Sequence, residues 1–427
     1  MKTTATPARN VRKFAMAERL PAGAPEALAP YVAARVVAIE DVAAAAAVVG
    51  MAARGDRPPA PDVRCWVALC LALRAPRDGH TCVLLDRIAD LAADLDPELA
   101  GQLELPATAE EWKTALASAG PLVGKPGDRA PFILEGDRLY LARSLHEEQE
   151  IARRLVGVAG QNVEILLGGP GTGKTTQVAK RLIEMFQATP GTRIALAAPT
   201  GKAAARMAEA LRGRLLDPNA PDEVKNASTQ VRERVAGTAP MTIHKLLGNH
   251  PLGTPRYRVN ASKSLDYDLV VVDEASMLSS SLMHHLLEAL GENTKLLLVG
   301  DPDQLASVDA GSVLGDIAAA GRSGARLSGR TDTLTERHRF GQRIGAIADA
   351  ILLGEACMAR AFEVLEGRWT PAPDPANDNR PDAVCWVQPG TENFRELEEE
   401  VVAHARRLER LAEEADPKAA VEFQKTL

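Results

Sequence analysis

The apolar residues of this chain follow two different patterns, and the pattern changes near residue 145. Before that point apolar residues recur at helical spacing, most clearly in the segments 31–49, 63–73 and 84–95. After it, short apolar runs alternate with helical segments. The sequence therefore predicts an α-rich domain over residues 1–145, followed by an α/β region.

The N-terminal region also contains one hairpin signal. Two short apolar runs, Phe132–Leu134 and Leu139–Leu141, flank the polar tripeptide Glu135-Gly136-Asp137. Such runs around a turn that contains glycine are typical of a β-hairpin. No catalytic pattern occurs in this region, so the default expectation for it is a scaffold or partner-docking role.

Four short apolar runs in the middle of the chain predict parallel strands. They are Val163–Leu167, Ile194–Ala198, Leu269–Val272 and Leu296–Val299. Short apolar runs separated by helices indicate a parallel sheet covered on both faces. Each run ends in a polar motif, and ligands bind at the carboxyl ends of strands in such sheets. We expect the polar segment 217–240 to be an insertion and the small-residue segment 311–330 to be a connector.

A glycine-rich segment follows the first of these strands, and a helical pattern follows the segment. It reads Gly168-Gly169-Pro170-Gly171-Thr172-Gly173-Lys174-Thr175-Thr176, the pattern of a phosphate-binding P-loop between a strand and a helix. The glycines let backbone N–H groups surround phosphate oxygens, and the helix N-terminus favours negative charge. Lys174 is expected to reach the β- and γ-phosphates of ATP, and the Thr175 hydroxyl to ligate Mg²⁺. The alternative, a glycine-rich turn without a ligand, is disfavoured by the complete motif and its two flanks.

An acidic pair follows the third predicted strand. A carboxylate at a strand tip opposite a P-loop holds Mg²⁺, so Asp273 is expected to bind the metal. Its neighbour Glu274 can then orient and deprotonate the attacking water. An acidic pair in this place can also be a helix cap, but the apolar strand before it and the P-loop favour the catalytic interpretation.

The other polar motifs, each taken alone, are weaker indications of function. Thr200 and Lys202 begin a predicted helix, where they suit an anion site, although Thr200 can equally be a helix cap. His244 stands beside a lysine in a motif that is usually structural. Gln304 follows the fourth strand and can sense a γ-phosphate or lie in a plain turn. Arg339 can neutralise transition-state charge or form an ordinary surface ion pair.

Composition sets only broad limits. A chain of 427 residues with 46% apolar and 25% charged residues is typical of a soluble protein of about two or three domains. The net charge of −7 gives no hint of nucleic acid, so any DNA-binding surface must be local. Five cysteines without a C-x-x-C pair indicate buried thiols in a reducing cytosol. No signal peptide or membrane-length apolar run is visible, and we expect a cytoplasmic protein.

Six motifs occur in a fixed order along the chain: GGPGTGKTT, APTGKAAAR, TIHKLLG, VVVDEASM, VGDPDQLASV and LTERHRF. This order resembles the superfamily 1 helicases and, more narrowly, the RecD family, the alpha subunits of exodeoxyribonuclease V. The segments 79–82 and 134–143 add to the narrower resemblance, which spans roughly residues 60–345. It implies a RecA-like ATPase domain over residues 146–330 and the start of a second RecA-like domain at residue 331.

The resemblance implies a DNA-stimulated ATPase that uses ATP and Mg²⁺. Such a subunit moves 5′ to 3′ on single-stranded DNA, in a complex with RecB and RecC that processes double-strand breaks. By motif, Lys174, Thr175, Asp273 and Glu274 keep the roles given above.

The same resemblance gives roles to the remaining candidates. Gln304 couples the nucleotide state to DNA, and Arg339 acts on the nucleotide from the second domain. Thr200, Lys202 and His244 lie along the DNA path. Gln149, upstream of the P-loop, is the candidate for reading adenine.

Two motifs of the family do not occur in this sequence: one resembling T-x-H-K-S-Q-G and one resembling Y-V-A-x-T-R-A. We therefore expect residues 331–427 to be a partial second RecA-like domain, in a truncated gene product, one half of a split gene or a fragment. Two hypotheses remain. The chain is an ATP-driven helicase subunit, whole or with a missing partner piece, or it is a non-motor ATP-binding scaffold that docks through its N-terminal domain.

Overall fold

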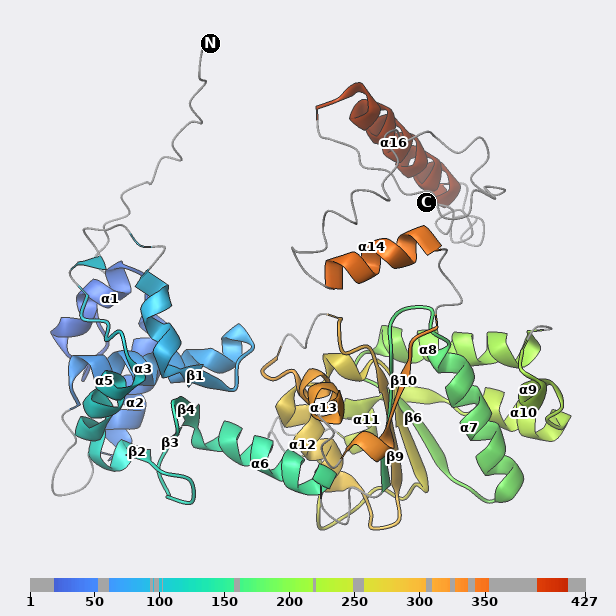
Figure 1. Cartoon of the computed structure of the whole chain (residues 1–427), viewed down its shortest axis with the longest axis horizontal. Helices are drawn as coiled ribbons and strands as arrows, with labels where there is room; N and C mark the ends of the chain where they lie inside the picture. The colour runs from blue at the N-terminus through green and yellow to red at the C-terminus, as the bar shows by residue number, and fades with distance from the viewer. Residues whose placement is uncertain are drawn as a thin grey trace. The chain divides into compact units, whose positions relative to one another are not determined.

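The computed structural model describes most of the chain between residues 19 and 413 (Figure 1). The described residues are 19–52, 61–92, 95, 100–101, 103–156, 162–217, 220–248, 257–304, 309–322, 327–336, 342–352 and 390–413. Contacts divide the chain into two units. One unit is Met1–Leu166 with Ala179–Asp332, and the other is Leu167–Val178 with Thr333–Leu427. Each is described by itself below.

The N-terminal region is largely helical, as the apolar spacing predicted. Its α-helices are α1 (Ala29–Ala33), α2 (Ile39–Ala52), α3 (Val63–Arg74) and α5 (Ala109–Leu116), with 3₁₀ turns η1 (Glu26–Leu28), η2 (Ala75–Asp78), η3 (Leu85–Ala92) and η4 (Ala117–Leu122). Trp112, Phe132 and Leu69 are fully buried in its core. The expected continuous helix over 31–49 is interrupted, because Arg35 adopts a left-handed backbone (φ 60°) between α1 and α2.

A small sheet completes this N-terminal region. Its strands are β1 (Cys82–Leu84), β2 (Val123–Gly124), β3 (Phe132–Glu135) and β4 (Arg138–Leu141), in the order β1-β4-β3-β2. The predicted hairpin is confirmed, with Glu135 paired to Arg138 across Gly136, whose φ is +60°. The expected helix over 84–95 is corrected: the segment leaves strand β1 and continues as the 3₁₀ turn η3. β1 and β2 are too short to show an alternating pattern.

A six-stranded sheet forms the centre of the α/β region. Its strands are β5 (Val163–Gly168), β6 (Ile194–Ala198), β7 (Pro240–Thr242), β8 (Leu269–Val272), β9 (Lys295–Gly300) and β10 (Thr331–Leu334), in the order β10-β5-β9-β8-β6-β7. β6 pairs in parallel with β7 and β8, and β8 with β9. All four residues of β8 are buried. Since successive side chains point to opposite faces, both faces of the sheet are covered there.

The predicted fold class and all four predicted strands are thus confirmed. The sequence missed β7 and β10. β10 begins at residue 331, where we expected a second domain, and it belongs to the same sheet as β5.

The helices of this region are α7 (Lys174–Ala188), α8 (Gly201–Leu216), α9 (Asp222–Lys225), α10 (Thr229–Gly237), α11 (Ile243–Leu247), α12 (Ser280–Ala289) and α13 (Val313–Arg322), with 3₁₀ turns η6 (Ala275–Met277) and η7 (Ser328–Arg330). The polar segment 217–240, which we expected to be an insertion, contains α9 and α10, and Val224 and Val235 of these helices are buried. The expected connector over 311–330 contains α13.

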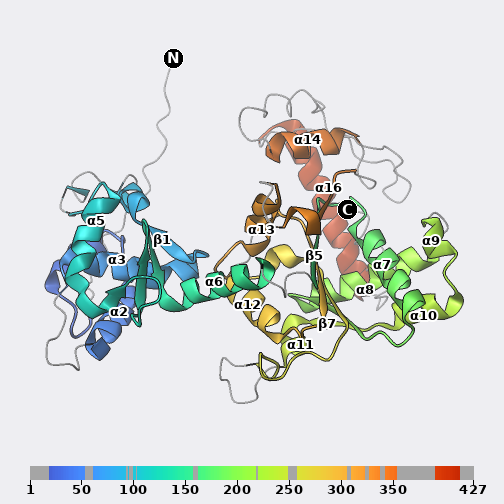
Figure 2. The ribbon, with the colours of Figure 1, turned by 60° about the horizontal axis from the view of Figure 1, so that its bottom comes forward.

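Helix α6 (Ala142–Val156) joins the hairpin to the central sheet and packs along α12 (Figures 1 and 2). Arg143 Nη2 donates to Ser281 Oγ (2.9 Å), and Arg154 Nη1 donates to the Leu287 carbonyl oxygen (3.1 Å). The domain boundary that we expected at residue 145 lies inside this helix.

The C-terminal region contains α14 (Gln342–Leu352) and α16 (Glu392–Glu413). α16 is rich in glutamate and arginine. Among the helices that the structure describes, none combines the length and the apolar character needed to span a membrane.

Candidate functional site

The glycine-rich segment runs from the end of β5 into α7, and its backbone requires glycine at three positions. Gly171 (φ 75°) and Gly173 (φ 87°) lie in the left-handed region that other residues rarely adopt. A Cβ on Gly168 would lie 2.5 Å from Thr172 Oγ1 and 3.1 Å from the carbonyl oxygen of Leu334. The spacing of glycines in the motif therefore follows from the shape of the loop.

Lys174 points back over this loop. Its Nζ donates hydrogen bonds to the carbonyl oxygens of Gly168 (2.5 Å) and Gly169 (3.0 Å). The Thr172 hydroxyl also donates to the Gly169 carbonyl oxygen (2.9 Å). Thr175 and Thr176 are partly buried in the first turn of α7, and the N–H of Thr176 donates to the carbonyl oxygen of Gly173 (2.9 Å). The segment thus brings one ammonium group, hydroxyls and the N-terminus of a helix to one short stretch of chain.

The acidic pair ends β8 in an unusual backbone conformation. Glu274 has φ 53° and ψ 41°, in the left-handed region, and its N–H donates to Asp273 Oδ1 (2.9 Å). Both residues are partly buried. A non-glycine residue in this region is uncommon, and such strained residues cluster at functional sites. The sequence alone does not show this turn.

The end of β9 lies directly beside this acidic turn. A Cβ on Gly300 would lie 3.2 Å from the backbone nitrogens of Ala275 and Ser276. Asp301, which follows, is only 3% exposed, and its Oδ1 accepts from the N–H of Asp303 (3.1 Å). Gln304 was predicted from this motif and Asp301 was not, although the sequence shows an aspartate close behind an apolar strand. Gln304 itself is exposed.

The predicted DNA-contacting residues follow two neighbouring strands. β6 and β7 pair with Ala198 opposite Thr242, so Thr200 and His244 come just after adjacent strand ends. Thr200 Oγ1 accepts from the N–H of Ala203 (3.1 Å), so the residue does cap α8. Lys202 and His244 are exposed, in the first turns of α8 and α11. Exposure leaves both free to meet a ligand, and capping does not exclude a contact from Thr200.

The remaining candidates are not tested by geometry. Gln149 is exposed in the middle of α6. Arg339 lies outside the described residues. The roles of both stay predictions.

Comparison with known proteins gives the chain a family context. The family model "RecBCD enzyme subunit RecD, N-terminal domain" matches residues 39–140, and a model of an AAA domain matches residues 152–310. RecBCD enzyme subunit RecD of Mycolicibacterium smegmatis is 37% identical over 401 residues, which cover 84% of this chain and 64% of that protein. RecBCD enzyme subunit RecD of Mycobacterium tuberculosis is 38% identical over 335 residues, 69% of this chain and 53% of that protein.

The chain is RecD-like. This confirms the resemblance drawn from the six motifs. The RecD-like chain spans 64% and 53% of the length of these two relatives. An ATP-dependent RecD2 DNA helicase of Deinococcus radiodurans is 38% identical over 178 residues, 42% of this chain and 20% of that protein. Among solved structures, Pif1 helicase from Candida albicans aligns with a TM-score of 0.26 and 15% identity over 53% of this chain and 48% of that one, which is too low to carry an argument.

The two matched segments divide the candidate residues. The AAA match contains the P-loop, the acidic pair and Gln304. The N-terminal RecD match covers the region in which the sequence shows no catalytic pattern. Gln149 falls between the two matched segments, and Arg339 lies beyond the second.

Proposed function

We propose that this RecD-like chain is the ATPase part of a DNA helicase that moves 5′ to 3′ on single-stranded DNA. The observation that carries the proposal is the segment 168–176, a complete P-loop in which Gly168, Gly171 and Gly173 are required by the shape of the loop. The match to an AAA domain over residues 152–310 supports it. The names of the relatives, RecBCD enzyme subunit RecD and RecD2 DNA helicase, support the choice of helicase.

The P-loop residues fit a nucleoside triphosphate. In the structure, Lys174 Nζ is held by two carbonyl oxygens of its own loop. Phosphate oxygens carry full negative charge and are stronger acceptors than carbonyl groups. We therefore expect Lys174 to exchange these carbonyls for the β- and γ-phosphates of ATP, while the backbone N–H groups of residues 171–175 surround the phosphates.

The oxygen ligands in the motifs fit Mg²⁺. This ion prefers hard oxygen donors, and the Thr175 hydroxyl with the Asp273 carboxylate supplies two of them. When bound, Mg²⁺ neutralises charge on the phosphates. Glu274 remains as the general base: it accepts the proton of the water that attacks the γ-phosphate.

DNA binding must come from local groups, since the net charge is −7. We assign it to Thr200, Lys202 and His244, which follow the adjacent strands β6 and β7. Gln304 at the end of β9 is proposed to relay the state of the nucleotide, Arg339 to act on the nucleotide, and Gln149 to read adenine.

We further propose that the N-terminal domain docks on RecB and RecC, as the names of the relatives suggest. Leu84 on the edge strand β1 and Leu91 on η3 are 43% and 44% exposed. Exposed apolar side chains beside an unpaired strand edge suit a protein partner. We propose that the resulting complex processes double-strand breaks in DNA, in the cytoplasm.

An ATPase assay with and without single-stranded DNA tests the function. Because two helicase motifs do not occur in these residues, we expect low basal turnover, little stimulation by DNA and no unwinding of a 5′-tailed duplex by residues 1–427. Supplying a segment that carries both motifs, taken from a relative, should restore all three.

The exposed apolar side chains of the N-terminal domain suit the second candidate, a non-motor ATP-binding scaffold that docks through this domain. A scaffold binds Mg·ATP but gains no DNA-stimulated turnover when the missing motifs are supplied. If the supplied segment does not restore DNA-stimulated turnover, the result therefore favours the scaffold over the helicase. Failure to bind Mg·ATP at all would reject both candidates.

A further inference from the structure

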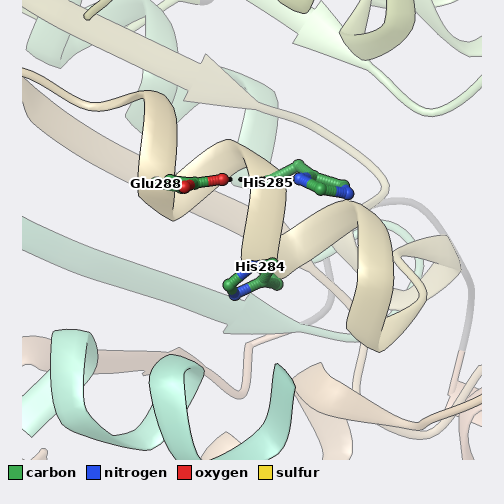
Figure 3. A group of neighbouring side chains, drawn as sticks. All are labelled: His284, His285 and Glu288. Atoms are coloured by element: carbon green, nitrogen blue, oxygen red, sulfur yellow. Dashed lines mark ion pairs between the residues drawn. The ribbon is translucent and has the colours of Figure 1, made fainter. Parts of the chain in front are cut away.

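Helix α12 carries three neighbouring side chains of the types that bind transition metals (Figure 3). They are His284, His285 and Glu288, and one donor atom from each lies within 4.8 Å of the others. His285 Nδ1 and Glu288 Oε2 are 3.6 Å apart. The cluster lies after the acidic pair in sequence, and the nucleotide and DNA roles proposed above do not use it.

One nitrogen of the cluster lacks a partner. Nδ1 of His284 is buried, and among the residues that the structure describes it has no hydrogen-bond partner. Buried polar atoms are nearly always satisfied, so an orphaned ring nitrogen calls for an explanation. A bound cation would supply the missing partner.

Aromatic rings from two other segments hold the imidazoles in place. The Tyr257 ring meets the His285 ring edge-on, with centroids 5.0 Å apart and an angle of 67°. On the other side, His146 of α6 lies against His284, with centroids 5.7 Å apart. Such contacts limit the rotation of both imidazole rings. The cluster therefore has the supporting neighbours that a metal site needs, and is more than three solvated side chains.

The chemical types of the three donor groups determine which metal ions the cluster suits. Two imidazoles and one carboxylate suit Zn²⁺ and its neighbours, whereas Mg²⁺ and Ca²⁺ prefer all-oxygen sites. Tetrahedral zinc with bonds of about 2.0–2.1 Å brings its donor atoms to about 3.3 Å from one another. The pair His285–Glu288, at 3.6 Å, is already near that spacing. His284, whose donor atom lies within 4.8 Å of the other two, supplies the third ligand.

We propose that His284, His285 and Glu288 form a binding site for one Zn²⁺ ion on α12. A water molecule takes the fourth position. All three ligands come from one helix, so the ion ties together the last turns of α12. The carbonyl oxygen of Leu287, in the same turns, accepts a hydrogen bond from Arg154 of α6. Zinc therefore stiffens the part of α12 that packs on α6.

The test is metal binding by metal-free protein, residues 1–427, purified with a tag that contains no histidine. Titration calorimetry with ZnCl₂ should show one ion per chain. His285→Ala and Glu288→Gln should each weaken zinc affinity by about tenfold or more, because each removes one of three ligands. The control is His80→Ala, an exposed histidine outside the cluster, which should bind zinc as the unaltered chain does.

Cobalt gives an independent readout. Co²⁺ in a four-coordinate site has strong visible absorption, which should appear with the unaltered chain and disappear in Glu288→Gln. That side chain is 30% exposed, so the substitution should leave the fold intact, as circular dichroism will check. No binding at stoichiometric zinc, or equal affinity in all variants, would overturn the proposal. Lys174→Ala should bind zinc normally, which separates this site from the proposed ATPase.

Discussion

The backbone N–H of Gly311 donates a hydrogen bond to the carbonyl oxygen of Gly79 (3.1 Å). Gly79 lies in the N-terminal region, just before β1, and Gly311 precedes α13, after the motif that ends β9. Gly311 has a φ of +97°, and a Cβ on it would clash with the side chain of Ser280 at the start of α12. One glycine thus links the N-terminal region to the helix that follows the acidic pair.

We predict that Gly311→Ala destabilises the protein by about 1–3 kcal/mol, the cost of a strained backbone together with a steric clash. Urea denaturation followed by circular dichroism measures the change. The control is Gly191→Ala, since a Cβ there has nothing within 4 Å. Equal stability of the two variants would show that the Gly311 contact is unimportant.

Removing the ammonium group of the P-loop should stop ATP turnover. Lys174→Ala takes away the charge that we assign to the phosphates, and turnover should fall by about 10²-fold or more, the scale for losing a preorganised charge-stabilising group. The measurement is phosphate release with a fluorescent-nucleotide titration alongside. Lys180→Ala is the control, because Lys180 lies on the same helix and pairs with Glu223 instead. Unchanged turnover in Lys174→Ala contradicts the P-loop assignment.

Replacing the proposed base should separate binding from chemistry. Glu274→Gln keeps the shape and the backbone conformation but cannot accept a proton. Nucleotide should bind with unaltered affinity while turnover falls by about 10²-fold, the scale of general base catalysis. Single-turnover hydrolysis and the nucleotide titration together test this. Parallel losses of both quantities would mean that Glu274 supports the structure only.

Binding to single-stranded DNA should be weak and should weaken further as salt rises, because only local charges contact the phosphates. Lys202→Ala should lower the affinity for an oligonucleotide and make its dependence on salt shallower by about one unit of slope. Fluorescence anisotropy over a series of salt concentrations measures both. A variant with the same affinity and slope would exclude α8 from the DNA path.

Two thiols should be unreactive while the protein is folded. Burial raises the pKa of Cys65 and of Cys70 to about 12, against a usual value of about 8.5. The folded state disfavours their thiolates, so both contribute stability at neutral pH that is lost as pH rises above the unfolded value. Peptide mapping after iodoacetamide at pH 8 should find both unmodified in native protein and modified in urea. Modification of either in the native state would contradict their burial.

Much of the α/β region could be predicted from the sequence, because its strands are apolar and each precedes a recognisable motif. The strands that were missed lack this contrast. β7 begins with Pro240 and its residues are half-buried, and β10 is mostly polar. α13 was hidden by small residues, although Val313 and Leu314 bury its inner face. Tertiary packing, and not the local amino-acid composition, determines the secondary structure of these elements.

The candidate site likewise has features that the sequence predicts and features that only the structure shows. The motif predicts Lys174 and Glu274, since chemistry fixes the residue types and spacing. The left-handed backbone of Glu274 depends on the turn between β8 and η6, which no local pattern reveals. The contact of Tyr257 with His285 likewise joins residues far apart in the sequence, so no periodicity could indicate it.

Helix α6 also determines how the protein can be divided into fragments for expression. Leu145 packs against Ile133 and Tyr140 of the hairpin, whereas Arg143 and Arg154 of the same helix donate to α12. A cut at either end of α6 therefore exposes apolar surface or leaves polar groups of α12 without partners. Only a fragment that contains the hairpin, α6 and α12 together keeps both sets of contacts, and fragments that separate them are expected to aggregate.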